Sequence, residues 1–132
     1  MQSNNTPATH LLTNTRLVGA VSQLAPGHAT VRLAPTADME VDARGLVHGG
    51  FVFGLADYAA MLAVNDPNVV LGAAETRFLA PVTRGITLEA IADVTVTKGR
   101  KRQVQVRVMR GQSCVMTGSF TCFVLDRHVL GD

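Results

Sequence analysis

The sequence predicts an α+β domain in which one long antiparallel sheet of about six strands curls around a single helix. The segment from Gly49 to about Val64 is rich in Ala and Leu and is too long for a usual strand, which favours a helix. It is apolar on every side except for one carboxylate, so other structure must wrap it. Two apolar segments precede it and four Val/Thr/Phe-containing segments follow, joined by short turns that imply antiparallel neighbours. A sheet curled around the helix satisfies all of these observations.

In the sequence, two expected strands precede the helix and four follow it. Residues 17–24 and 28–33 form a predicted hairpin, because the turn signal Pro26-Gly27 separates them. Residues 35–47 are polar and form the longest expected loop. Four further strands are expected at 69–80, 86–97, 102–110 and 113–125.

Length and composition limit the class of protein. With 132 residues, 47% of them hydrophobic, and a net charge of +2, the chain suits one folded domain and not a disordered one. Residues 1–10 have almost nothing to bury, so we expect a disordered N-terminus followed by a single domain over 11–132. The low aromatic content of 5% and the lack of general basic character argue against nucleic acid as a partner.

The sequence also predicts a cytoplasmic protein. No stretch reaches the ~18 consecutive apolar residues that a membrane span requires, and the first ten residues lack a signal-peptide pattern. If Cys114 and Cys122 share one strand, they are ~26 Å apart at ~3.3 Å per residue and cannot form a disulfide with each other. Two reduced thiols fit a cytosolic location.

The start of the helix is a candidate site. Free backbone N–H groups and the positive end of the helix dipole lie at Val47-His48-Gly49-Gly50, and glycine allows a ligand to approach closely. Such a place would stabilise a carbonyl oxygen that gains negative charge. The alternative is a glycine-rich helix entry where the backbone passes close to a strand.

Asp57 is the second candidate. It is the only charge between His48 and Asn65, and burying a carboxylate costs several kcal/mol unless it is paired. Desolvation would raise its pKa and make it a stronger base or nucleophile. The alternatives are a salt bridge to an arginine such as Arg77, or exposure at a gap in the sheet.

The spacing of these two candidates predicts a dimer. Gly49 and Asp57 are eight residues apart, hence ~12 Å along a helix at 1.5 Å per residue. One reacting carbonyl cannot contact both groups on one straight helix. If they cooperate, antiparallel helices of two protomers must bring them together, which gives a symmetric dimer with two interfacial sites. A six-stranded sheet would in any case leave edges and one helix flank for a second chain to cover.

Four positive charges cluster in the predicted turn Lys98-Gly99-Arg100-Lys101-Arg102. A solvated surface is one interpretation of such a run. The other is a patch for the phosphates of a nucleotide-like carrier. The four histidines are scattered without ligand spacing, and the common phosphate-loop, dinucleotide and serine-hydrolase motifs are missing, so no metal or cofactor is expected.

Longer strings of the sequence carry a family resemblance. LVHGGFVFGLADYAAMLAV, followed by AETRFLAPVTRGITLEAIADV and KGRKR, resembles the hot-dog-fold acyl-CoA thioesterases, in particular the phenylacetate-pathway type. The match runs from about Gly45 to Leu125. Its ordered parts are an HGG helix entry, an acid nine residues after the histidine, an F-x-x-P-V strand end and a basic hairpin.

The resemblance implies roles for individual residues. Gly49 corresponds to the oxyanion amide, and Asp57 to the catalytic carboxylate that acts as nucleophile or general base. His48 corresponds to the motif histidine, which orients the loop or contacts substrate. Arg100, Lys101 and Arg102 are the candidates for binding the coenzyme A phosphates, and no separate cofactor is implied. The acyl chain is expected near Gly50 in an apolar tunnel lined by residues such as Phe53, Leu55 and Met61.

One position departs from the family pattern. Asp42 lies six residues before His48, where many relatives have Asn or Gln. It is expected to be one of the substrate-binding residues. A second carboxylate near Asp57 would raise one pKa and repel an anionic acyl group. The segment NDPNVVLGAAETRF also resembles non-catalytic hot-dog domains that sense malonyl-CoA. The prediction is therefore a homodimeric or homotetrameric acyl-CoA thioesterase, and the alternative is an acyl-CoA-binding or sensing protein without catalysis.

Overall fold

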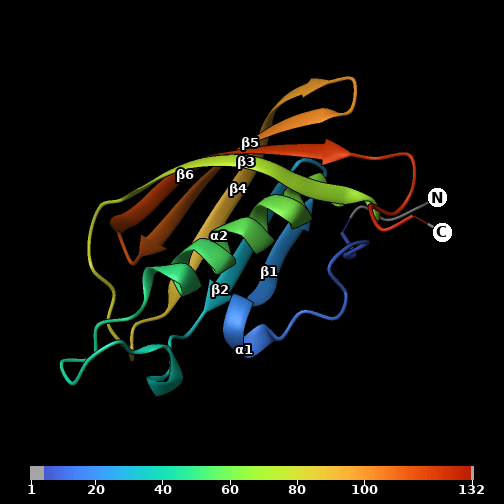
Figure 1. Ribbon diagram of the computed structural model, residues 1–132. Helices are drawn as coiled ribbons and strands as arrows, with labels where there is room; N and C mark the ends of the chain where they lie inside the picture. The colour runs from blue at the N-terminus through green and yellow to red at the C-terminus, as the bar shows by residue number, and fades with distance from the viewer. Residues whose placement is uncertain (1–4, 132) are drawn as a thin grey trace.

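A computed structural model describes residues 5–131 and contains one six-stranded antiparallel sheet curled around one long helix (Figure 1). The α+β prediction is confirmed. The strands occur in the sheet in the order β1-β2-β4-β5-β6-β3. In chain order the elements are α1 (Thr15–Val18), β1 (Ala20–Ala25), β2 (His28–Leu33), the 3-10 helix η1 (Ala37–Met39), α2 (Gly49–Val64), β3 (Val69–Phe78), β4 (Leu88–Lys98), β5 (Lys101–Arg110) and β6 (Ser113–Val124).

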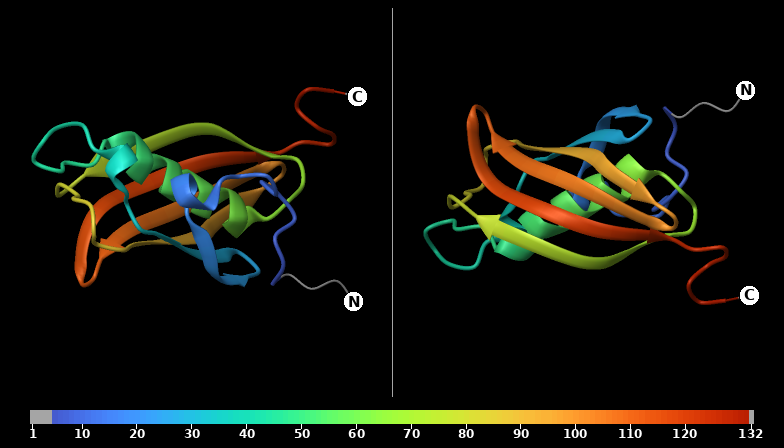
Figure 2. Two further views of the ribbon diagram at one scale, coloured as in Figure 1. Left: turned by 90° about the horizontal axis from the view of Figure 1, so that it is seen from below. Right: turned by 90° about the horizontal axis from the view of Figure 1, so that it is seen from above.

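Helix α2 has the bounds that the sequence predicts. His48 caps its N-terminus, and it ends at Asn65, whose left-handed backbone (φ 53°) lets its N–H donate to the Met61 carbonyl. Most of its residues are buried, because it packs on the curled sheet and on α1. Figure 2 shows the helix lying along the concave side of the sheet.

The core lies between α2 and the inward-facing side chains of the strands. Val104, Val106 and Val108 of β5 are at most 2% exposed, and Phe120 and Cys122 of β6 are fully buried. The helix packs mainly on β2, β4 and β5 and makes fewer contacts with β6 and β3. The β3 side of the concave face therefore extends past the helix.

The predicted strand over 17–24 is wrong in its first residues. The pattern predicts strand throughout 17–24, but Leu17 and Val18 belong to α1, and β1 begins only at Ala20. The Asn14 side chain accepts a hydrogen bond from the Arg16 N–H and so initiates a helical turn. Gly19, at φ 103°, then redirects the chain into β1; a Cβ at this position would lie 2.8 Å from the Arg32 carbonyl oxygen.

The N-terminal segment is held against the end of α2 over part of its length. The expected disorder concerns residues 1–10, of which 1–4 lie outside the described residues. The Asn65 side chain accepts from the Ala8 N–H at 2.7 Å and donates to the Thr6 carbonyl at 3.0 Å, and Thr9 is 6% exposed. These bonds fix residues 6–9 in place.

Two further expectations concern the cysteines and a membrane-spanning helix. Cys114 and Cys122 both lie on β6 and are free, as the spacing predicts. Within residues 5–131, no helix has the length and apolar character needed to cross a membrane.

Candidate active site

The first turn of α2 presents one unused backbone donor. The His48 Nδ1 accepts a hydrogen bond from the Gly50 N–H at 2.7 Å, and the His48 carbonyl accepts from the Phe51 N–H. The Gly49 N–H has no acceptor among the described residues, and Gly49 is exposed. Because the helix dipole is positive here, this N–H can donate to an oxygen that gains negative charge. Of the two motif glycines, Gly49 is thus the one whose donor is free.

An apolar cavity of about 360 Å³ opens beside Gly49. Phe78 forms one wall, and its ring lies 3.5 Å from where a Cβ on Gly49 would be. Phe78 and Leu79 are 54% and 55% exposed, so the cavity is open on the β3 side. The lining residues are Leu46, Val47, Gly49, Val52, Phe78, Leu79, Ala80, Pro81 and Val82.

Most of these wall residues are not among the site residues that the sequence predicts. The F-x-x-P-V string that contains Phe78 and Val82 enters only as part of the family resemblance. Two residues expected to line an acyl tunnel, Leu55 and Met61, do not line this cavity; they are at most 1% exposed and belong to the core. Phe53 is half-buried and packs on Phe120 with ring centroids 5.6 Å apart.

Asp57 lies two turns further along α2 and is half-buried. Its Oδ1 is inaccessible to solvent and has no hydrogen-bond partner. Burial raises the pKa of this carboxyl above its ordinary value, and the nearby His10 only partly offsets the rise. No ion pair joins Asp57 to Arg77 or to any other described residue. Asp57 is thus a desolvated carboxyl without the salt bridge considered as the alternative.

The surroundings of Asp57 include Cys122 on β6. Burial, and then the negative charge of Asp57, raise the pKa of the Cys122 thiol to about 12. A thiol with that pKa is protonated at neutral pH and is a poor nucleophile. Of these two neighbouring groups, the reactive candidate is therefore the Asp57 carboxyl and not the Cys122 thiol.

Asp42 does not join this cluster within the protomer. Its Oδ1 accepts from the Arg44 N–H at 3.0 Å and from the Leu46 N–H at 3.3 Å, so it closes its own loop. The raised pKa of Asp57 comes from burial, and Asp42 is not among its causes. The expected effect of Asp42 on the pKa of Asp57 is therefore not found within one chain.

The basic turn lies at the far end of the molecule from Gly49. The turn between β4 and β5 projects beyond the sheet near the C-terminal end of α2 (Figure 1). Arg100 pairs with Asp126, and the Arg102 guanidinium donates to the carbonyls of Gly99 and Lys101. Lys98 and Lys101 are exposed and form no ion pair with a described residue. They are the charges left free to meet an anion.

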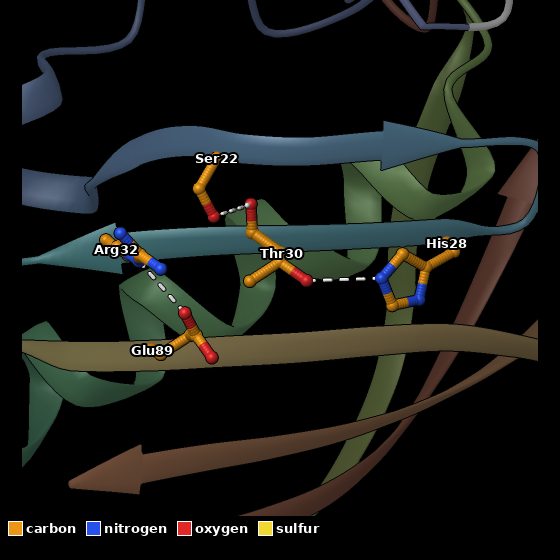
Figure 3. A network of polar contacts seen from close by, with 5 residues as sticks. All are labelled: Ser22, His28, Thr30, Arg32 and Glu89. Atoms are coloured by element: carbon orange, nitrogen blue, oxygen red, sulfur yellow. Dashed lines mark hydrogen bonds and ion pairs between the residues drawn. The ribbon is translucent and has the colours of Figure 1, made fainter. Parts of the chain in front are cut away.

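A separate polar network covers the outer face of β1, β2 and β4 (Figure 3). His28 contacts Asp93 at 2.7 Å and Thr30 at 3.1 Å, and Arg32 donates to Glu89 at 2.9 Å. These side chains are hydrogen-bonded to one another on the side of the sheet away from α2. No group of His, Cys, Asp and Glu in residues 5–131 is arranged to hold a metal ion.

A curled six-stranded antiparallel sheet around one long helix is the arrangement of the hot-dog fold. The Thioesterase superfamily model matches residues 44–116, more than half of the chain, so the protein belongs to the thioesterase superfamily. That range includes Gly49, Asp57 and the basic turn.

Solved structures resemble the chain over most of its length. Uncharacterized protein PH1136 from Pyrococcus horikoshii is 50% identical with a TM-score of 0.95, over 98% of this chain and 99% of that one. A mutant form of phenylacetic acid degradation protein PaaI from Thermus thermophilus is 32% identical with a TM-score of 0.76, over 84% and 97%.

Two curated relatives are longer proteins. Methylthioribose-1-phosphate isomerase from Aquifex aeolicus is 45% identical over 94% of this chain, but the match spans 27% of that protein. Transcription factor FapR from Thermoanaerobacter sp. is 28% identical over 90% of this chain and 60% of its own length. The chain thus spans about a quarter to three fifths of these relatives.

Proposed function

We propose that the protein hydrolyses an acyl-CoA thioester at two equivalent sites, each shared between two copies of the chain. The observation that carries this proposal is the pair of unsatisfied groups on one apolar helix, the free Gly49 N–H and the buried, unpartnered Asp57 Oδ1. Membership of the thioesterase superfamily and the likeness to PaaI support the reaction class.

In the proposed reaction the oxygen of the thioester carbonyl accepts a hydrogen bond from the Gly49 N–H of one protomer. The partner's Asp57 removes a proton from water, the hydroxide forms the new C–O bond, and the electron pair of the carbonyl moves to its oxygen. When the carbonyl reforms, the C–S bond breaks, and the leaving thiolate takes the proton that Asp57 received from water, which returns Asp57 to its carboxylate form. A raised pKa suits Asp57 to proton abstraction, because the best general base has a pKa near the working pH. Direct attack by the carboxylate is the other route, through an anhydride that water then cleaves.

Two copies are needed because α2 is one unbroken helix. Gly49 and Asp57 lie ~12 Å apart along its axis at 1.5 Å per residue. An antiparallel partner helix would bring its Asp57 to the Gly49 cavity. It would also bring its β4–β5 turn towards that end, where Lys98, Lys101 and the two arginines of the turn could meet the coenzyme A phosphates. The exposed cavity wall at Phe78 and Leu79 would hold the start of the acyl chain.

The test is thiol release from acyl-CoA by wild-type protein and by Asp57→Asn. A screen over short, long and aromatic acyl chains identifies the best substrate, and we expect the variant to lose about 10²–10⁴-fold in rate on it. Circular dichroism and size-exclusion chromatography check that the variant keeps its fold and assembly. Equal rates in the two proteins would contradict the proposal.

A second candidate is an acyl-CoA-binding protein without catalysis. The likeness to FapR, a transcription factor, favours it. Purified protein would then retain intact acyl-CoA in native mass spectrometry and release no coenzyme A over hours. Release of free acid and coenzyme A that depends on Asp57 would exclude this candidate.

A further inference from the structure

A histidine on β2 joins a hydroxyl to a carboxylate on the outer face of the sheet. His28 and Thr30 are two residues apart on β2, so their side chains point to the same face, and Asp93 of β4 lies directly opposite His28. The His28 Nδ1 lies 2.7 Å from the Asp93 Oδ1, and the His28 Nε2 lies 3.1 Å from the Thr30 Oγ1 (Figure 3). The three side chains therefore form one hydrogen-bonded chain in the order carboxylate, imidazole, hydroxyl.

The donors and acceptors available fix the direction of both hydrogen bonds. An ionised Asp93 can only accept, so the His28 Nδ1 carries the hydrogen and donates it. The other nitrogen of a neutral imidazole is then an acceptor, so the Thr30 hydroxyl donates to the His28 Nε2. In this arrangement a histidine can act as a general base towards a hydroxyl, while the acid fixes its tautomer.

The threonine lies at a cavity that a small molecule can enter. Thr30 is 6% exposed, but together with His28 it lines a cavity of about 390 Å³ on the outer face. The side chains of His28 and Asp93 are partly open to solvent. The other residues that line the cavity are Ser22, Gln23, Arg32, Glu89 and Ile91. Because all but one of the lining residues are polar, the cavity suits a small polar ligand and not a long apolar chain.

Arg32 places a positive charge at the same cavity. It follows Thr30 by two residues on β2 and so shares its face. The Arg32 Nε donates to the Glu89 Oε2 at 2.9 Å, which fixes the side chain beside β4. The two terminal nitrogens of Arg32 have no hydrogen-bond acceptor among the described residues. They can therefore donate to a carbonyl oxygen that gains negative charge when the hydroxyl attacks.

We propose that Thr30 and His28, oriented by Asp93, form a second catalytic site that hydrolyses small carboxylic esters through an acyl-threonine intermediate. The groups present are those that acyl transfer to a hydroxyl requires: a nucleophile, a base, an acid that orients the base, and a donor for the developing oxyanion. The site lies on the side of the sheet away from α2 and does not depend on the function proposed for that helix.

Both half-reactions use the same proton route. The Thr30 Oγ1 bonds to the ester carbonyl carbon and passes its proton to the His28 Nε2, while an electron pair of the carbonyl moves to its oxygen, beside Arg32. The carbonyl then reforms, the bond to the alcohol oxygen breaks, and the leaving alcohol takes the proton from His28. In the second half, His28 takes a proton from water, the water oxygen bonds to the acyl carbon, and the Thr30 oxygen leaves with that proton.

The probe is p-nitrophenyl acetate, because its acyl group is small and the nitrophenolate that it releases is coloured. Asp57→Asn protein is the parent for all measurements, so that the carboxyl of α2 does not contribute. Nitrophenolate release is followed over time, and samples quenched in acid are digested and analysed by mass spectrometry. We expect release well above that in buffer, with the acetyl group on Thr30, since the good leaving group makes acylation the faster step.

Three variants separate the roles of the groups. Thr30→Val keeps the shape of the side chain and should abolish both the enzymatic release and the acetylation at this position. Thr30→Ser keeps the hydroxyl and should retain both. Asp93→Asn should lower the rate about 10²–10⁴-fold, because the His28 Nδ1 loses its anionic acceptor and the imidazole its tautomer.

A matched control excludes unspecific acetylation. Thr121→Val removes a hydroxyl of β6 that donates to Gln103 at 3.0 Å, and it should leave the rate unchanged. Circular dichroism checks the fold of each variant. Equal release by Thr30→Val and its parent, an acetyl group only on lysine, cysteine or histidine, or no release above that in buffer would overturn the proposal.

The two proposals fail separately. Release of nitrophenolate that depends on Thr30, in a protein with no thiol release from acyl-CoA, would leave the outer site standing and remove the proposed function. Thiol release that depends on Asp57 and is unchanged in Thr30→Val, without ester hydrolysis on the outer face, would do the reverse.

Discussion

The Nδ1 atom of His48 accepts a hydrogen bond from the N–H of Gly50 at 2.7 Å. This bond caps α2 and requires an unprotonated Nδ1. It also uses the Gly50 donor, which leaves the neighbouring Gly49 N–H as the free one. The His48 side chain thus caps the helix start within the protomer.

Loss of this cap should cost stability. His48→Ala is expected to lower the free energy of unfolding by about 0.5–2 kcal/mol, and His48→Asn, which can cap, by less. Gly50→Ala should have a similar effect, because its Cβ would lie 2.8 Å from the His48 Nδ1 and displace the ring. Urea unfolding followed by circular dichroism measures all three. An unchanged midpoint in both His48→Ala and Gly50→Ala would show that the cap contributes nothing.

Removal of the Gly49 N–H should remove oxyanion stabilisation. Gly49 is the first residue of α2, a position where proline is tolerated, and the extended backbone of His48 (φ −61°, ψ 130°) suits a residue before proline. We expect Gly49→Pro to lower kcat about 10²–10³-fold. Gly49→Ala keeps the N–H and meets Phe78 at an ordinary 3.5 Å, so it is the matched control and should lose far less. Similar losses in the two variants would indicate a steric effect and not a missing donor.

The buried carboxyl of Asp57 should make stability depend on pH. Its folded pKa is raised, so the protein binds this proton more tightly than the unfolded chain does. Stability from this group is therefore complete below the ordinary pKa of 3.8 and is lost as pH rises through the folded value. Asp57→Asn should unfold at a higher temperature than wild type at pH 7, and the difference should shrink towards pH 4. Thermal unfolding of both proteins across this range provides the test, and a variant less stable at pH 7 would contradict it.

The basic turn should act on substrate binding by charge. Lys101→Ala is expected to raise KM for acyl-CoA several-fold at low salt while kcat changes little, and the effect should shrink near 0.5 M salt as screening grows. Arg107→Ala removes an exposed charge from the outer face of the same strand and is the control. Equal KM values for both variants would assign the turn to the solvated surface.

Much of the fold could be predicted because its signals are local. The bounds of α2 follow from a long Ala/Leu-rich segment between a glycine pair and Asn65-Asp66-Pro67. The start of β1 could not, because residues 17 and 18 are apolar enough for a strand and only the Asn14 cap turns them into a helix.

The sequence singles out Gly49 and Asp57 as candidate groups, but it does not reveal which residues form the walls of the cavity beside Gly49. Asp57 stands out as a lone charge in an apolar helix, and its lack of a partner agrees with that signal. Phe78 and Leu79 reach the Gly49 cavity only because β3 lies at the sheet edge, which is a matter of strand order. Met61 is expected to line the acyl tunnel, but it is 1% exposed and belongs to the core of the protomer.

The most direct test of a site shared by two chains is subunit complementation. Gly49→Pro and Asp57→Asn proteins, each inactive alone, are unfolded together, refolded as a mixture and assayed for thiol release. In a mixed dimer one site carries both changes, and the other combines an intact Gly49 with the partner's intact Asp57. Activity should therefore return to about a quarter of the wild-type value, since random pairing makes half of the dimers mixed and each has one working site of two. No recovery, in a mixture shown by native mass spectrometry to contain mixed dimers, would contradict the shared site.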